Sequence, residues 1–189
     1  MLATRANRSV KDRVQIVGIC GNTHRPSKTR ALVEKVAQDL QNCNSIESEI
    51  FDLVDFGPEL RLASAVDELN MKGKEILEMI ASADAIIVGS PVYKGSYSGL
   101  FKHLFDLMAP GCLRDKPVLL TATGGGQRHA LMIEHHLRPL FGFFEALSMP
   151  TVVYASDAEF GGGAVVDPSV LSRINVATQQ LSGILRIGA

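Results

Sequence analysis

Apolar runs alternate with amphipathic segments along most of the chain. Five short runs are rich in β-branched and aliphatic residues, as buried parallel strands are. Between them, apolar residues recur every three or four positions, which indicates amphipathic helices. The predicted strands are residues 14–20, 46–53, 85–89, 117–123 and 151–154. The predicted helices are residues 27–41, 67–81, 99–108, 129–147 and 168–185, and Pro139 is expected to kink or break the fourth of them.

This regular alternation predicts one doubly wound parallel sheet with helices on both faces, an α/β fold. Residues 46–53 alternate apolar and acidic side chains, which is typical of a strand near the edge of a sheet. The small size and the early Gly21 favour the flavodoxin-like strand order 2-1-3-4-5 over the other common order. We therefore expect a single five-stranded flavodoxin-like domain at residues 13–189, preceded by a flexible tail at residues 1–12.

Composition and charge give no reason to expect nucleic acid or membrane as a partner. The 189 residues have a formal net charge of −1, so no electrostatic attraction to polyanions is expected. No apolar run approaches the ~20 residues that span a bilayer. The basic tail is short of acids, like a transit peptide, but it lacks the apolar core of a signal peptide. The three scattered cysteines, Cys20, Cys43 and Cys112, argue against a disulfide framework or a metal site and indicate the cytoplasm.

The loop after the first strand, residues 21–30, has the features of a phosphate site. It leads into a helix, whose free N–H groups and positive dipole end attract an anion. Ser27 and Thr29 add hydroxyl donors, although the simpler alternative is that Ser27 only caps the helix. The loop lacks the glycines of a P-loop and of a dinucleotide-binding turn, so a single phosphate fits best. It also carries four positive or potentially positive side chains: His24, Arg25, Lys28 and Arg30.

The loops after the third and fourth strands have the features of a cradle for a flat ring. Pro91 stiffens the exit from the third strand, and Tyr93 offers an aromatic face and a hydroxyl. Gly124, Gly125 and Gly126 leave space where a side chain would occupy the plane of a bound ring. Ordinary packing of the tyrosine and a flexible glycine turn are the alternatives. Because residues 90–102 contain no carboxylate, the loop suits a flat, electron-rich ligand better than it suits hydrolysis.

Residues 21–29, 90–102 and 122–126 together resemble the NAD(P)H-dependent FMN reductases of flavodoxin-like fold, in particular those that serve alkanesulfonate and methanesulfonate monooxygenases. The resemblance implies hydride transfer from NADH or NADPH to FMN, with reduced flavin supplied to a partner monooxygenase. It also implies a homodimer or homotetramer. The first loop would hold the FMN phosphate, with His24 where relatives often carry Arg, and the other two loops would hold the isoalloxazine. No catalytic side chain or metal ligand is expected, and the expected binding residues are His24, Ser27, Lys28, Thr29, Pro91, Val92, Tyr93, Thr123, Gly124, Gly125 and Gly126.

The resemblance extends into the fourth predicted helix. Some relatives carry an inserted aromatic residue there, and His135, beside His136, stands at the matching position. An inserted residue predicts a π-bulge at this pair. The simpler alternative is a solvated or interface patch of histidines.

Other functions remain open on the same fold. A quinone, azo or chromate reductase would retain FMN and reduce a second substrate. A flavodoxin-type electron carrier would surround the flavin with acids and aromatics, whereas this chain has no Trp and has Lys94 in its central loop. A receiver domain would need an aspartate at the end of the third strand, where Ser90 stands.

Overall fold

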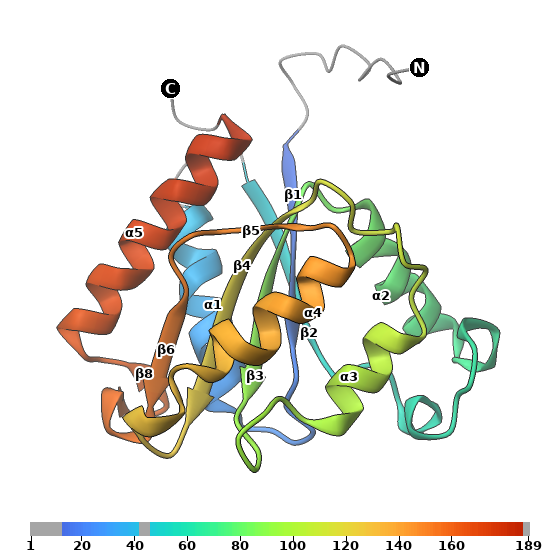
Figure 1. Cartoon of the computed structure of the whole chain (residues 1–189), viewed down its shortest axis with the longest axis horizontal. Helices are drawn as coiled ribbons and strands as arrows, with labels where there is room; N and C mark the ends of the chain where they lie inside the picture. Colours follow the sequence, from blue (N-terminus) through green and yellow to red (C-terminus); the bar gives the residue numbers. More distant parts are fainter. Residues whose placement is uncertain (1–12, 42–45, 187–189) are drawn as a thin grey trace.

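The computed structural model describes residues 13–41 and 46–186. The predicted tail at residues 1–12 and Cys43 lie outside this range. A parallel sheet with the order β2-β1-β3-β4-β5 runs through the centre (Figure 1), which confirms the predicted fold. Its four long strands are β1 (Val14–Cys20), β2 (Ile46–Asp52), β3 (Ala85–Pro91) and β4 (Pro117–Gly124).

The outer position beside β4 is shared by two short strands instead of one. β5 (Leu147–Ser148) and β6 (Val153–Ser156) both pair with β4 in parallel. Pro150, which has no N–H for the ladder, lies between them. The predicted strand at residues 151–154 is therefore displaced by two residues toward the C-terminus.

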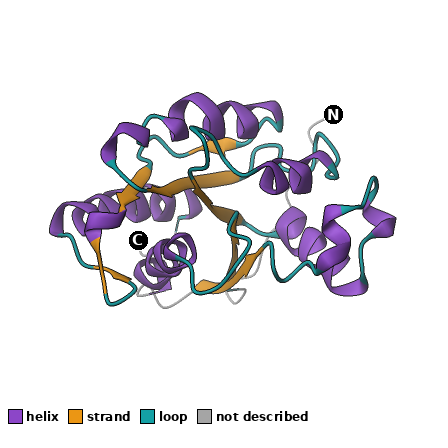
Figure 2. Cartoon of the chain, turned by 90° about the horizontal axis from the view of Figure 1, so that it is seen from below, coloured by secondary structure: helices purple, strands orange, loops and turns teal. Residues whose placement is uncertain are grey.

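Helices cover both faces of the sheet, as the view from below shows (Figure 2). Two hydrophobic clusters hold them there. Leu32 and Ile174 belong to the cluster on one face, and Ile76, Phe101 and Phe141 belong to the cluster on the other. The first face carries α1 (Lys28–Gln41) and α5 (Pro168–Leu185), and the second carries α2 (Met71–Ser82), α3 (Gly99–Asp106) and α4 (Arg138–Phe143).

The second helix begins at Met71, later than the predicted residue 67. Asn70 is its N-cap, and the Asn70 side chain accepts a 2.8 Å hydrogen bond from the N–H of Gly73. Asparagine is among the best capping residues, so this cap sets the start. Val66–Glu68, before this cap, form a separate 3₁₀ turn.

The long fourth helix predicted at residues 129–147 is divided into three pieces. A 3₁₀ turn (Gln127–His129) is followed by a π-helix (Ile133–Leu137) and then by α4. The predicted π-bulge at His135 and His136 is confirmed. Pro139 falls in the first turn of α4, where its missing N–H costs nothing. The helix ends at Phe143, and Glu145 adopts a positive φ of 55° before the chain joins the sheet.

Within the described residues, no helix is long and apolar enough to cross a membrane.

Candidate functional site

The three loops that the sequence singled out meet at the carboxyl end of the sheet (Figure 1). The hydroxyls of Thr29 and Thr123 share a 2.6 Å hydrogen bond, which joins the start of α1 to the end of β4. The N–H of Val92 donates to the carbonyl of Thr123 at 2.7 Å, which joins the loop after β3 to the same point. Thr29 and Thr123 are buried and Val92 is half-buried. The structure therefore brings residues from all three loops into one site.

Ser27 caps the first helix. Its Oγ accepts from the N–H of Arg30 at 3.3 Å, and its carbonyl accepts from the N–H of Ala31 at 3.0 Å. The Ser27 cap is therefore present. It does not exclude an anion, because the hydroxyl proton takes no part in the cap and remains free to donate.

Two of the four cations predicted near a phosphate are directed toward β2 instead. Arg25 donates two hydrogen bonds to Asp52, at 2.7 and 2.8 Å, and a third to Asp55 at 2.5 Å. Arg30 lies 3.2 Å from Asp52 and 2.8 Å from Glu34. Both guanidinium groups therefore anchor the loop to the end of β2, so they are not free to meet a phosphate.

The other two cations of the loop are exposed. Lys28 pairs with Asp157 at 2.8 Å. The exposed His24 side chain forms no ion pair with any other described residue.

The Asp52 carboxylate is the buried centre of this anchor. The Asp52 side chain is 0% exposed and also accepts a 3.1 Å hydrogen bond from the amide of Asn22. Burial acts to raise the pKa of Asp52, but the hydrogen bonds from Arg25 and Asn22 outweigh it, so the pKa lies below its ordinary value. The pKa of Asp55 is lowered as well, because the N–H of Asp52 and the side chain of Arg25 outweigh its burial. Both groups are therefore held as carboxylates.

A tight hairpin turn follows β3. The N–H of Tyr93 donates to the carbonyl of Ser96 at 2.8 Å, and the reverse bond measures 3.1 Å. Lys94 and Gly95 between them have positive φ angles of 51° and 87°, as the two central residues of a type I′ turn do. Pro91 is half-buried, and Tyr93 is 44% exposed. The turn therefore presents an accessible aromatic ring on a stiff backbone.

The π-helix touches this hairpin through His136. The Nδ1 atom of His136 lies 3.1 Å from the hydroxyl of Ser96, and its ring makes an edge contact with Tyr97 at 6.2 Å between centroids. Sequence reasoning left the role of this histidine open. Its contacts show that it supports the loop after β3.

The three glycines after β4 differ in the space that surrounds them. A Cβ at Gly124 would stand 2.5 Å from the hydroxyl of Tyr154, and that hydroxyl donates to the carbonyl of Gly126 at 2.7 Å. Gly124 is therefore required by packing against Tyr154. At Gly125 and Gly126 a Cβ would meet nothing within 4 Å. The space at these two positions is therefore open.

A fourth loop, after β6, also reaches the site. Lys28 contacts Asp157 in this loop and lies 5.6 Å from the centre of the Phe160 ring. Gln127, after β4, is hydrogen bonded to Glu159. Sequence reasoning missed this loop and Tyr154, although a parallel outer strand must end at the same edge of the sheet.

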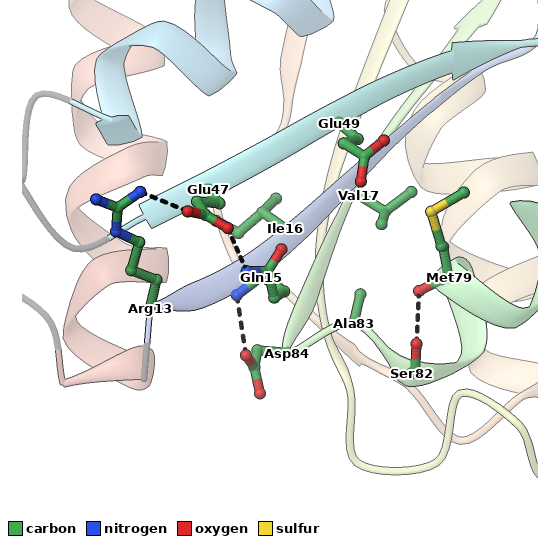
Figure 3. Close-up of a pocket in the computed structure, with 10 residues that line it drawn as sticks. All are labelled: Arg13, Gln15, Ile16, Val17, Glu47, Glu49, Met79, Ser82, Ala83 and Asp84. Atoms are coloured by element: carbon green, nitrogen blue, oxygen red, sulfur yellow. Dashed lines mark hydrogen bonds and ion pairs between the residues drawn. The ribbon is translucent and has the colours of Figure 1, made fainter. Parts of the chain in front are cut away.

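The opposite end of the sheet has a hollow of about 600 Å³, with Gln15, Glu47 and Asp84 in its wall (Figure 3). Several of its polar groups bind one another. Arg13 pairs with Glu47 at 2.5 Å, and Gln15 donates to Glu47 at 2.7 Å. The N–H of Gln15 donates to Asp84 at 3.0 Å. This hollow lies away from all four loops, so the carboxyl end of the sheet is the better candidate site.

The comparisons with known proteins agree with this choice. Residues 14–160 match the family of NADPH-dependent FMN reductases. The chain is 42% identical over 166 residues to an FMN reductase (NADPH) of Pseudomonas aeruginosa, covering 88% of this chain and 89% of that protein. It is also 42% identical over 167 residues to the NADH-dependent FMN reductase SfnF of Pseudomonas fluorescens, with shares of 88% and 89%. Among solved structures, the apo form of the NADH:FMN oxidoreductase EmoB aligns with a TM-score of 0.80 and 27% identity, over 93% of this chain and 91% of that one.

Proposed function

The chain belongs to the family of NADPH-dependent FMN reductases, and we propose that it supplies reduced FMN to a partner monooxygenase that desulfonates organic sulfonates. It is an oxidoreductase that uses FMN with NADH or NADPH. The matched region contains the first three loops of the candidate site and the start of the fourth. The observation that carries the proposal is that the capped helix start, the end of β4 and the loop after β3 meet through Thr29, Thr123 and Val92, with open space at Gly125 and Gly126.

Each loop then has a distinct task. The bound flavin supplies the hydride chemistry itself. The Ser27 hydroxyl and the N–H groups at the start of α1 bind the phosphate, and His24 and Lys28 stand nearby. Thr29 and Thr123 join the start of α1 to the end of β4 through their shared hydrogen bond. Pro91, Val92 and Tyr93 orient one side of the ring, and Gly125 and Gly126 admit the other.

The sulfonate partner is supported by the resemblance of residues 90–102 to flavin reductases of sulfonate monooxygenase systems. Because Tyr93 is 44% exposed, the ring side of the site is open to exchange of the flavin. We further propose a cytoplasmic location, which suits the free thiols of Cys20 and Cys112. We also propose a homodimer or homotetramer, as the resemblance of the three loops implies.

Oxidation of NADH and NADPH, measured with and without added FMN, FAD or riboflavin, tests the activity. We expect oxidation that depends strictly on added FMN, and a purified protein that loses its yellow colour on dilution. Colour retained through dilution, together with turnover of a quinone or azo dye, would favour the FMN-retaining reductase instead. Absence of oxidation with every flavin would overturn both the flavin reductase and the FMN-retaining reductase as the function.

Replacing Ser27 by alanine tests the phosphate site. We expect the affinity for FMN to fall by about tenfold while the affinity for riboflavin, which has no phosphate, stays unchanged. The lost cap should also lower the free energy of unfolding by about 1 kcal/mol. Flavin fluorescence titrations and urea unfolding measure the two effects separately. Equal weakening of FMN and riboflavin would place the phosphate elsewhere.

A further inference from the structure

Lys28 is the first residue of α1, at the helix end where the proposed phosphate site lies. Its ammonium group is drawn away toward the loop after β6. It lies 2.8 Å from Asp157 and 5.6 Å from the centre of the Phe160 ring. The side chains of Lys28 and Asp157 are 43% and 63% exposed, so both remain accessible to a ligand.

The cations around the first loop are balanced by carboxylates of the protein. Arg25 is held by Asp52 and Asp55, and Arg30 is held by Asp52 and Glu34. An FMN phosphate that arrives here meets few uncompensated positive charges.

Lys28 differs from the two arginines in how firmly it is held. The arginines share Asp52, whose side chain is 0% exposed. Releasing them would leave a buried carboxylate without its ion-pair partners. The partner of Lys28 is an exposed carboxylate in another loop. Exposed ion pairs contribute only about 0–1 kcal/mol. Lys28 is therefore the paired cation that can change partners at the lowest cost.

We propose that Asp157 sets the affinity for FMN by competing with the FMN phosphate for Lys28. The inference rests on the proposed function, because it assumes that FMN binds with its phosphate at the start of α1. Asp157 is then a positioning residue that acts through Lys28. Competition of this kind lowers the affinity for any phosphorylated flavin and does not change the binding of the isoalloxazine ring. It gives the site a means to release its flavin, as a reductase that supplies reduced flavin to another enzyme requires.

The variant D157N provides the main test. Asparagine has nearly the same shape, and the capping box of this turn uses Ser156 and Glu159, not residue 157, so the fold should be retained. We expect FMN to bind about two- to fivefold more tightly, because Lys28 is released from an exposed ion pair. Riboflavin affinity should not change. Dissociation constants of the full-length protein come from quenching of flavin fluorescence, at low and at high salt, and the gain should shrink at high salt.

Asp106 offers a matched control. It is exposed and pairs with Lys102 one turn earlier on α3, at the end of that helix remote from the site. D106N makes the same change of charge without releasing Lys28. We expect its affinity for FMN to equal that of the wild type.

The variants K28M and K28M/D157N show whether Lys28 carries the effect. In the K28M background, D157N should bring no gain in FMN affinity. A gain that persists there would mean that Asp157 acts by direct repulsion, and it would overturn the proposal. Unchanged FMN affinity in D157N, or an equal gain for riboflavin, would overturn it too. Failure of the proposed function looks different, because the wild-type protein would then bind neither flavin or would retain FMN through dilution.

Discussion

Replacing Gly125 by leucine is expected to lower kcat/KM for FMN by about 100-fold while leaving the thermal stability unchanged. A Cβ at this position meets nothing within 4 Å, and Gly125 does not have a positive φ. The fold therefore tolerates the side chain. A leucine there fills the open space after β4 in which we place the ring, and misplacing a reacting group by about 1 Å can cost about 100-fold in rate. Steady-state NADH oxidation and thermal unfolding measure the two quantities.

Two other glycines serve as controls for this prediction. Gly111 lies in the turn after α3 and is also exposed, and a Cβ there would likewise meet nothing within 4 Å. G111L should leave both activity and stability unchanged. Gly124 should instead affect stability, because a Cβ there would stand 2.5 Å from the Tyr154 hydroxyl. G124A should lower the free energy of unfolding by about 1–3 kcal/mol. Full activity in G125L would show that the ring does not lie over Gly125.

Replacing Asp52 by asparagine is expected to lower the free energy of unfolding by about 2–3 kcal/mol. Asp52 is buried and accepts hydrogen bonds from Arg25, Arg30 and Asn22. Removing the charge of one partner from a buried pair typically costs about 3–5 kcal/mol. The cost should be smaller here because the Arg25 side chain is 43% exposed. Urea unfolding at neutral pH measures this loss.

The same substitution should change the acid sensitivity of the protein. The pKa of Asp52 is lower in the folded chain than its ordinary value, so its contribution to stability is complete above that value, which is about 3.9. This contribution is lost as the pH falls through the lower folded pKa. Wild-type stability should therefore decline below about pH 4, and D52N should decline less steeply. A parallel decline in the two proteins would contradict the role assigned to Asp52.

Loosening of the first loop should also appear in ligand binding. Asp52 holds Arg25 and Asn22, which stand in the loop before Ser27. D52N should therefore weaken the binding of FMN more than the binding of riboflavin. D106N, which removes a remote exposed carboxylate, should stay within about 0.5 kcal/mol of the wild type in stability. Equal weakening of both flavins would point to general destabilisation and not to the loop.

Local patterns were sufficient for most of the fold. The apolar runs of β1, β3 and β4 are continuous because both faces of these strands are covered by helices. Pro168, at the first position of α5, and the apolar period after it predicted that helix with its observed bounds. The predicted bounds were wrong where another local signal was stronger. The Asn70 cap makes α2 begin later than predicted, and two short strands, β5 and β6, lie on either side of Pro150.

The chemical character of the site was also readable from the sequence, but the pairing of its charges was not. Residues 21–29, 90–102 and 122–126 predicted a phosphate site and a ring cradle, because carboxyl ends of parallel strands share one edge. Nothing in the spacing of Arg25 and Asp52 shows that they meet. Lys28 and Asp157 are separated by most of the chain, and only the sheet order brings them within 2.8 Å.

The sequence by itself determined the order of strands and helices, the three predicted loops and the residue types that suit a flavin. These follow from local periodicity, turn residues and chain order, which act over short distances along the chain. Only the tertiary structure decided which cations of the first loop remain available, which glycine is required by Tyr154 and which two are open, and that a fourth loop reaches the site. Those outcomes depend on contacts between distant segments, whose distances are set by the packing of the whole sheet and its helices.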